Sequence, residues 1–201
     1  MQAPLSAPKR QPPKRSAADP VFSPSFYRPY AQAVETALFM LGSARSRLVR
    51  ETGEDVRSIT YRLKSPASIR GKLLKKGLPV CEPAARAALH DVAGLRVVLP
   101  GEKQVYRFAA LLRDSPVTRL LDEKDYIAEP KPSGYRSLHL VLGVPVSLRG
   151  QSLLVPVELQ LRTAAMDMWA SIEHDMVYKP DAAQDAGLSL PQDGRGITMR
   201  A

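Results

Sequence analysis

Apolar residues recur along this chain with two periods, one typical of helices and one typical of strands. Residues 30–50, 104–114 and 163–178 carry apolar side chains every three or four positions, which predicts three amphipathic helices. In the last of these segments the spacing predicts a stripe that is buried against the core. The residues of this stripe are Met166, Trp169, Ile172 and Met176.

Other segments are predicted to be strands. They are residues 58–64, 91–99, 137–146 and 153–162, and a turn around Arg149 and Gly150 joins the last two. A further helix is predicted to begin with Ser65 as its N-cap and Pro66 in its first turn, and to continue to Lys76. This mixture predicts an α/β (α+β) fold in which helices pack on one central sheet.

Proline marks the limits of the folded region. Seven of the first 29 residues are proline, and because proline removes backbone donors we expect this stretch to form neither helix nor sheet. Its basic residues form an arm that either contacts RNA or is a solvated tail. They are Lys9, Arg10, Lys14 and Arg15. We expect a disordered basic tail at 1–24, one domain at 25–180 and a loose tail at 181–201.

Composition narrows the class of protein. The 201 residues include 29 Lys and Arg against 20 Asp and Glu, and the net charge of +9 either attracts an anionic ligand or serves solubility alone. The single cysteine, Cys81, excludes an internal disulfide framework and a multi-cysteine zinc site. No apolar run is long enough for a transmembrane helix, and the first residues lack the apolar region of a secretory signal. We therefore expect a cytoplasmic protein without membrane association.

Polar side chains share one face of the two clearest strands. Because side chains alternate along a strand, Glu158, Gln160 and Arg162 lie opposite the apolar residues of segment 153–162. Tyr135 and His139 lie on the corresponding face of the preceding strand. If the two strands pair, an aromatic ring, an imidazole and a carboxylate form a floor on which a base can stack. A solvated sheet face and a hydrogen-bonded core histidine are the competing interpretations.

Basic side chains gather on the helix after Ser65 and on the strand before it. One face of the helix presents four polar residues, and the strand adds two cations on one side. These residues are Ser68, Lys72, Lys75, Lys76, Arg62 and Lys64. Cations aimed at one volume repel each other unless an anion lies between them, and a polyphosphate meets that need. A solvated lysine-rich face is the alternative.

Two carboxylates are candidates for a magnesium site. Asp91 begins a predicted strand and Glu158 lies within another. Mg²⁺ in proteins is usually held by one or two carboxylates, with water and phosphate completing its coordination. The sequence alone does not select this pair among the 20 acidic residues.

Four segments together resemble the synthetase domain of RelA/SpoT-type alarmone enzymes. They are residues 62–77, 90–98, 126–142 and 157–179, and the likeness is closest to the stand-alone small alarmone synthetases. The resemblance implies a nucleotidyltransferase-like domain with a mixed central β-sheet flanked by helices. It extends over about residues 26–179 of the 201, so we expect neither a hydrolase domain before it nor a regulatory region after it.

Enzymes of this family transfer the β,γ-diphosphate of ATP to the 3′-hydroxyl of GDP or GTP. The resemblance implies that Arg62 and Arg96 lie on the two faces of the adenine. It implies further that the ATP phosphates are bound by Lys64, Ser68, Lys72 and Lys75. Asp91 and Glu158 would bind Mg²⁺, and Glu158 would also take the proton of the 3′-hydroxyl. The acceptor site would comprise Lys131, Tyr135, His139, Gln160, Asp167 and Glu173, with Tyr135 stacked on guanine.

We therefore expect a GTP/GDP pyrophosphokinase that makes (p)ppGpp and AMP. The alternative is a toxin that pyrophosphorylates the 3′ end of tRNA, since the basic arm would suit a nucleic acid. A degenerate binding module is a third interpretation, which the presence of Asp91, Tyr135 and Glu158 disfavours. Relatives that form tetramers carry a helical extension after the position of Lys179, whereas the 22 residues that follow here are broken by glycine and proline. The oligomeric state stays open.

Overall fold

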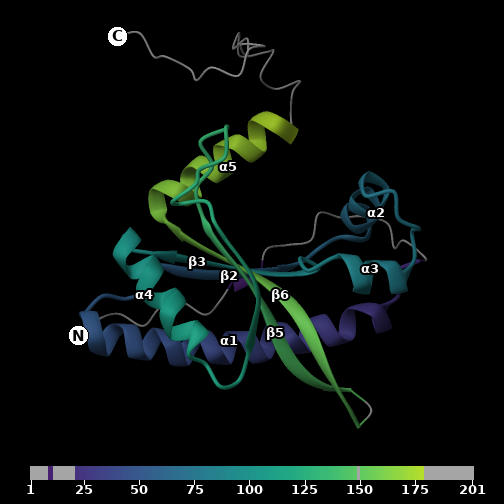
Figure 1. Ribbon diagram of the computed structural model, residues 1–201, viewed down its shortest axis with the longest axis horizontal. Coiled ribbons are helices and arrows are strands. Elements are labelled where there is room, and N and C mark those ends of the chain that lie inside the picture. Colours follow the sequence, from purple (N-terminus) through teal and green to yellow (C-terminus); the bar gives the residue numbers. More distant parts are fainter. Residues whose placement is uncertain (1–8, 11–20, 149, 179–201) are drawn as a thin grey trace.

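One mixed β-sheet organises the chain in the computed structural model, which describes residues 9–10, 21–148 and 150–178 (Figure 1). The strand order is β1-β2-β3-β6-β5-β4. β3 is parallel to β6 and β1 to β2, and the other neighbours are antiparallel. The strands are β1 (Lys9–Arg10), β2 (Ser58–Leu63), β3 (Ala93–Leu99), β4 (Arg119–Asp125), β5 (Leu138–Leu148) and β6 (Gln151–Thr163). The predicted mixed sheet flanked by helices is confirmed.

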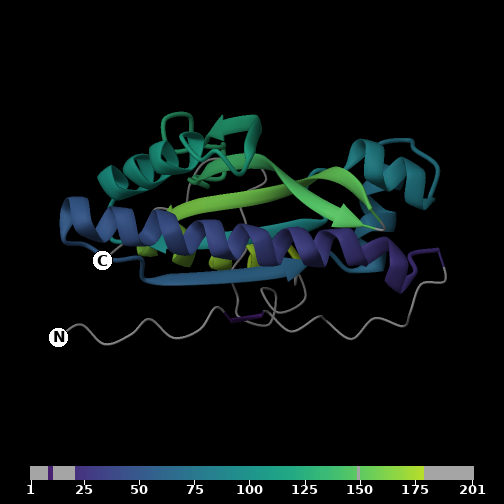
Figure 2. The same cartoon turned by 90° about the horizontal axis from the view of Figure 1, so that it is seen from below.

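The helices divide between the two faces and the ends of this sheet. They are α1 (Pro24–Thr52), α2 (Pro66–Lys75), α3 (Glu82–Ala88), α4 (Glu102–Arg113) and α5 (Ala164–Tyr178). Figure 2 shows α1 lying along the length of the sheet, and α1 contacts β2, β3, β5, β6 and α4. The buried side chains of α1 and α4 share one core with Val157, Leu159 and Leu161 of β6. The apolar face of the sheet is thereby covered, and the polar face is left for chemistry.

The expectation that the proline-rich first 29 residues form neither helix nor sheet is wrong in two places. Helix α1 begins at Pro24 because the Ser23 side chain caps it by accepting a hydrogen bond from the Phe26 amide, and proline in a first turn needs no N–H partner. Lys9 and Arg10 pair with Thr60 and Tyr61 on the open edge of β2. The rest of 1–20, and the predicted tail at 181–201, lie outside the described residues.

The helix predicted after Ser65 is confirmed as α2. The Ser65 hydroxyl accepts a hydrogen bond from the Ser68 amide at 3.3 Å, and Pro66 occupies the first turn. This cap fixes where the helix starts relative to β2. Lys64, at the end of the strand, and Lys72, in the last turn of the helix, are thereby directed toward the same loop.

The buried stripe predicted on α5 is wrong for two of its members. Met166 is buried, but Trp169 is 45% exposed and Ile172 is 43% exposed. The cause is the direction of the helix, which contacts β6 and β3 and then extends beyond the sheet (Figure 1). The Met176 side chain lies outside the described residues. Across the described chain, the helices are too short or too polar to span a membrane.

Candidate active site

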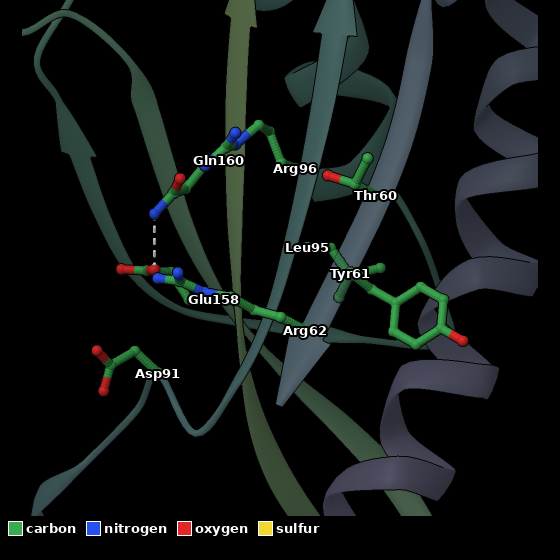
Figure 3. Close-up of a pocket in the computed structure, with 9 residues that line it drawn as sticks. Thr60, Tyr61, Arg62, Asp91, Leu95, Arg96, Glu158 and Gln160 are labelled. Atoms are coloured by element: carbon green, nitrogen blue, oxygen red, sulfur yellow. Dashed lines mark hydrogen bonds between the residues drawn. The ribbon is translucent and has the colours of Figure 1, made fainter. Parts of the chain in front are cut away.

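A polar pocket lies on the face of the sheet opposite α1, where β2, β3 and β6 run side by side (Figure 3). The strand register places its side chains together, because Thr60 is opposite Arg96, and Gly94 is opposite both Arg62 and Glu158. Asp91 enters from the loop before β3. The pocket is lined by Thr60, Tyr61, Arg62, Asp91, Gly94, Leu95, Arg96, Glu158 and Gln160.

Asp91 is held by two lysines. Its Oδ2 atom accepts hydrogen bonds from Lys64 Nζ at 2.5 Å and from Lys72 Nζ at 2.7 Å. Burial raises the pKa of the Asp91 carboxyl, but the charges and hydrogen bonds of Lys64 and Lys72 outweigh burial and hold the pKa below its ordinary value. Asp91 is therefore ionised at neutral pH. Its Oδ1 atom is buried and has no hydrogen-bond partner within the described residues.

Glu158 faces a different set of neighbours. Its Oε2 atom accepts a hydrogen bond from Gln160 Nε2 at 2.9 Å, and His139 Nδ1 lies 3.4 Å from Oε1. Burial and the negative charge of Asp91 raise the pKa of Glu158. The hydrogen bonds of His139 and Gln160, and the charge of His139, nevertheless leave it below its ordinary value. Glu158 is therefore a carboxylate at neutral pH and can accept a proton.

The two carboxylates fit a divalent cation. They line the same pocket, they are close enough for Asp91 to raise the pKa of Glu158, and Asp91 Oδ1 is an oxygen ligand without a partner among the described residues. Mg²⁺ is commonly held by one or two carboxylates, with water and substrate phosphates completing its coordination. Within residues 9–10, 21–148 and 150–178, no group of three or more His, Cys, Asp or Glu side chains could hold a metal ion.

The guanidinium groups predicted to hold adenine share this face. Arg96 Nη1 lies 3.0 Å from Asp167 Oδ1, and Arg96 Nε is buried without a hydrogen-bond partner in the described part of the chain. Burial lowers the pKa of Arg96, and the positive charges of Arg162 and Arg62 lower it further. Arg62 is exposed at the pocket mouth.

Aromatic side chains gather beside the pocket, around His139. The ring centroids of Tyr126 and Tyr135 lie 5.2 Å and 5.8 Å from that of the imidazole. Lys131 Nζ lies 4.7 Å from the Tyr126 ring centroid and 4.8 Å from that of Tyr135. Lys131, Tyr135 and His139 are therefore brought together as predicted. The sequence reading did not select Tyr126, although it is the first residue of the segment that carries this cluster.

Arg162 is a second residue to which the sequence reading gave no role. Its position on the polar face follows from strand alternation. Its side chain, however, is only 4% exposed and is hydrogen-bonded to four other side chains. Its nitrogens donate to Tyr135, Gln160, Asp167 and Ser137. The predicted acceptor residues Gln160 and Asp167 are therefore linked to Tyr135 through one guanidinium group.

Three predicted site residues are not joined to these clusters. The Ser68 hydroxyl is hydrogen-bonded to Ser65 at the start of α2. Lys75 is exposed on α2 and Glu173 is half-buried on α5, and neither forms an ion pair within the described residues. Their roles stay predictions.

Comparison with known proteins gives a consistent result. The family described as "Region found in RelA / SpoT proteins" matches residues 61–183. GTP pyrophosphokinase YjbM of Bacillus subtilis is 37% identical over 155 residues, which cover 77% of this chain and 72% of YjbM. GTP pyrophosphokinase YwaC of the same organism is 42% identical over 118 residues, which cover 59% of this chain but only 56% of YwaC.

Solved structures show the same likeness over more of the chain. Small alarmone synthetase 1 from Bacillus subtilis, bound to its product pppGpp, superimposes with a TM-score of 0.69 and 32% identity over 84% of this chain and 82% of its own. The structure of that protein bound to AMPCPP gives a TM-score of 0.66 and 30% identity, covering 84% of this chain and 81% of its own.

Proposed function

Because the chain belongs to the RelA/SpoT family, we propose that it transfers the β,γ-diphosphate of ATP to the 3′-hydroxyl of GDP or GTP, forming (p)ppGpp and AMP. The observation that carries this proposal is the meeting of two ionised carboxylates, Asp91 and Glu158, with several cations on one face of the sheet. Phosphoryl transfer asks a protein mainly for positioning and charge neutralisation.

The donor nucleotide is assigned to the β2–β3 side of the pocket. Arg62 and Arg96 lie diagonally across these strands on one face. In this proposal they would contact the two sides of an adenine. Lys64 and Lys72, which now bind Asp91, supply ammonium groups for the phosphates. An incoming polyphosphate would compete with Asp91 for both lysines.

The acceptor nucleotide is assigned to the β5–β6 side. Tyr135 supplies a ring for the guanine, and Lys131 supplies a cation beside that ring. His139 and Gln160 are opposite each other in the register of β5 and β6, and both contact Glu158. An acceptor ribose near these side chains would have its hydroxyl within reach of the carboxylate.

The reaction needs one proton acceptor in this arrangement. The 3′-oxygen of the acceptor forms a bond to the β-phosphorus of ATP, the bond between that phosphorus and the α,β-bridging oxygen breaks, and AMP leaves with the bridging oxygen. Glu158 takes the proton of the 3′-hydroxyl, because it is ionised and lies in the pocket. Asp91 and Glu158 would hold Mg²⁺, which when bound neutralises charge on the transferred diphosphate.

The deciding experiment incubates the protein with Mg²⁺ and γ-labelled ATP, together with GDP, GTP or deacylated tRNA in separate reactions. The proposal expects label in a guanosine tetra- or pentaphosphate and release of AMP. Label in the tRNA, with none in the guanine nucleotides, would contradict it. A chelator should abolish the transfer in every reaction.

A further inference from the structure

The Arg162 guanidinium occupies a fixed place under the acceptor side of the pocket. The residue is 3% exposed. Its Nη1 atom donates to Asp167 Oδ1 at 3.1 Å, and its Nε atom donates to Ser137 Oγ at 3.4 Å. The Ser137 hydroxyl in turn donates to the Leu161 carbonyl oxygen. These contacts hold Nη2 in one position, and every partner of this nitrogen must accept, because a guanidinium has no acceptor atom.

One hydrogen-bonded chain from Nη2 passes through Gln160. Nη2 donates to Gln160 Oε1 at 2.8 Å. Gln160 Nε2 in turn donates to Glu158 Oε2 at 2.9 Å, the bond drawn as a dashed line in Figure 3. An amide can be turned either way, and its orientation follows from its partners. Because Arg162 only donates, the amide oxygen must face it, and the NH₂ group is thereby directed at Glu158.

A second chain from the same nitrogen passes through Tyr135 and His139. Nη2 donates to the Tyr135 hydroxyl at 2.5 Å, that hydroxyl lies 2.8 Å from His139 Nε2, and His139 Nδ1 lies 3.4 Å from Glu158 Oε1. An ionised Glu158 only accepts, so Nδ1 carries the proton. In a neutral ring Nε2 is then bare, and the Tyr135 hydroxyl must donate to it.

We propose that Arg162 is a positioning residue for Glu158, acting through these two chains, which begin at one nitrogen and end on the two oxygens of one carboxylate. The inference rests on the proposed role of Glu158 as the base. Holding both oxygens fixes the plane of the carboxylate, and therefore the direction from which it can accept the proton of the acceptor hydroxyl.

Steady-state kinetics test this role. Arg162→Met removes both chains and should lower kcat by about 10- to 100-fold, the usual cost of removing a hydrogen-bonded outer partner of a metal-binding side chain. The KM values for ATP and acceptor should change much less, and Arg162→Lys should recover part of the kcat. Arg45→Met is the control. It removes a partly exposed ion pair with Asp55 that lies outside the site, and it should leave kcat unchanged. An unchanged kcat with a raised acceptor KM in Arg162→Met would overturn the proposal.

Each chain can also be broken by itself. Tyr135→Phe keeps the ring but removes the hydroxyl, and Gln160→Met removes the amide at similar size. Each should lower kcat in the wild-type background and have a much smaller effect when Arg162 is already Met, because residues of one network do not act additively. Full additivity would contradict the two chains. If Arg162→Met does not fold, as judged by its thermal unfolding, a normal kcat in both single variants would contradict them equally.

A spectroscopic test is independent of catalysis. The ring nitrogens of ¹⁵N-labelled histidine distinguish the two neutral tautomers by NMR, and the His139 signals are assigned as those lost in His139→Gln. At alkaline pH, His139 should carry its proton on Nδ1, and the Nε2 signal should shift in Tyr135→Phe and in Arg162→Met. A proton on Nε2 would overturn the second chain. If the wild-type protein transfers no diphosphate, the proposed function fails while this result still decides the hydrogen-bond network.

Discussion

Two carboxylates in one pocket are kept ionised by different neighbours, and this difference suits them to different tasks. Asp91 is paired with two ammonium groups and keeps one oxygen without a partner in the described chain. Glu158 is bound instead by an imidazole and an amide. Its unpartnered oxygen suits Asp91 to binding a metal ion, whereas Glu158 is better suited to receive a proton.

Glu158→Gln should abolish diphosphate transfer while leaving the fold intact. An amide cannot take a proton and is a poor magnesium ligand, so the loss should be at least roughly 10²- to 10⁴-fold for the base alone. Turnover is measured with labelled ATP, and circular dichroism confirms folding. Near-normal turnover in the purified variant would remove Glu158 from the mechanism.

Asp91→Asn should separate nucleotide binding from turnover. The substitution releases Lys64 and Lys72 from a negative charge, so a non-hydrolysable ATP analogue should bind more tightly in the presence of a chelator, by roughly tenfold, which corresponds to about 1.4 kcal/mol. Turnover should fall, and the Mg²⁺ concentration for half-maximal activity should rise. Calorimetry and a Mg²⁺ titration measure the two effects. Weaker binding without metal would show that Asp91 does not compete with phosphate.

Residue-level prediction succeeded where alternation along a strand decides the face, and it failed where a role depends on contacts between distant residues. Glu158 and Gln160 lie on the polar face that alternation predicts. Asp91 could be chosen only by resemblance, because nothing local distinguishes it from other acids. The role of Arg162 was not predictable, since it depends on Ser137 and Asp167, which meet it only in the folded chain.

At the scale of elements, long periodic segments were predicted well and short or exposed ones were missed. Helix α3 spans only seven residues, which is too few for a clear period. Strand β4 lies at an edge of the sheet and none of its residues is buried, so it lacks the apolar alternation that marks a strand. The exposed Trp169 on α5 was misplaced because a helical period does not show where a helix leaves the sheet.

An ion pair whose strength depends on pH joins Arg45 of α1 to Asp55 in the loop before β2. Arg45 donates two hydrogen bonds to Asp55, and these, together with a hydrogen bond from the Val56 amide and the Arg45 charge, outweigh burial and lower the pKa of Asp55. A lowered folded pKa means that this stability is fully present above the unfolded value of about 3.9 and is lost as pH falls through the folded value.

Asp55→Asn should therefore cost about 1 kcal/mol of unfolding free energy at neutral pH, the scale of a partly exposed pair. The difference from wild type should shrink as pH falls below about 4. Urea unfolding of both proteins, from neutral pH to below about 4, measures this difference in unfolding free energy. A cost that stays constant down to the lowest pH would mean that Asp55 acts by packing and not by charge.

Trp169 connects α5 to the loop that carries Lys131 and Tyr135. Its indole N–H donates to the Ser133 carbonyl oxygen at 3.2 Å. The ring also lies against Gly134, which has a φ of 79°, so that a Cβ atom at this position would be in contact with the indole. Trp169→Phe keeps a ring but loses this hydrogen bond, worth about 1 kcal/mol.

The acceptor KM of Trp169→Phe should accordingly rise about fivefold, with little change in the KM for ATP. The matched control is Met168→Leu, because Met168 is the more exposed neighbour on the same helix. Equal changes in both KM values would show that α5 supports the whole domain and not this loop in particular.

At the scale of the whole molecule, the sheet separates stability from chemistry. Its apolar face forms the core with α1 and α4, and its polar face carries the pocket to which we assign both nucleotides. Substitutions in the core should therefore lower the free energy of unfolding with little change in the KM values.

The net charge of +9 is also a property of the whole chain, and salt dependence tests what it serves. A GDP or GTP acceptor offers few phosphates, so its KM should rise only gently between low and physiological salt. Replacing Lys9, Arg10, Lys14 and Arg15 by glutamine should leave that KM almost unchanged. With a tRNA acceptor, the logarithm of the affinity would fall steeply with the logarithm of the salt concentration, with a slope of about −0.7 for each phosphate contact on a single strand. This slope would become shallower in the glutamine variant.

The short strand β1 has a consequence for the protein in concentrated solution. An unpaired sheet edge is a template on which a second chain can add its own strand, and repetition of that step produces aggregates. Lys9 and Arg10 occupy part of the outer edge of β2. At the opposite edge, β4 is exposed, contains five charged residues and has an irregular register between Leu120 and Asp122. Both edges of the folded sheet thus disfavour edge-to-edge association between copies of the chain.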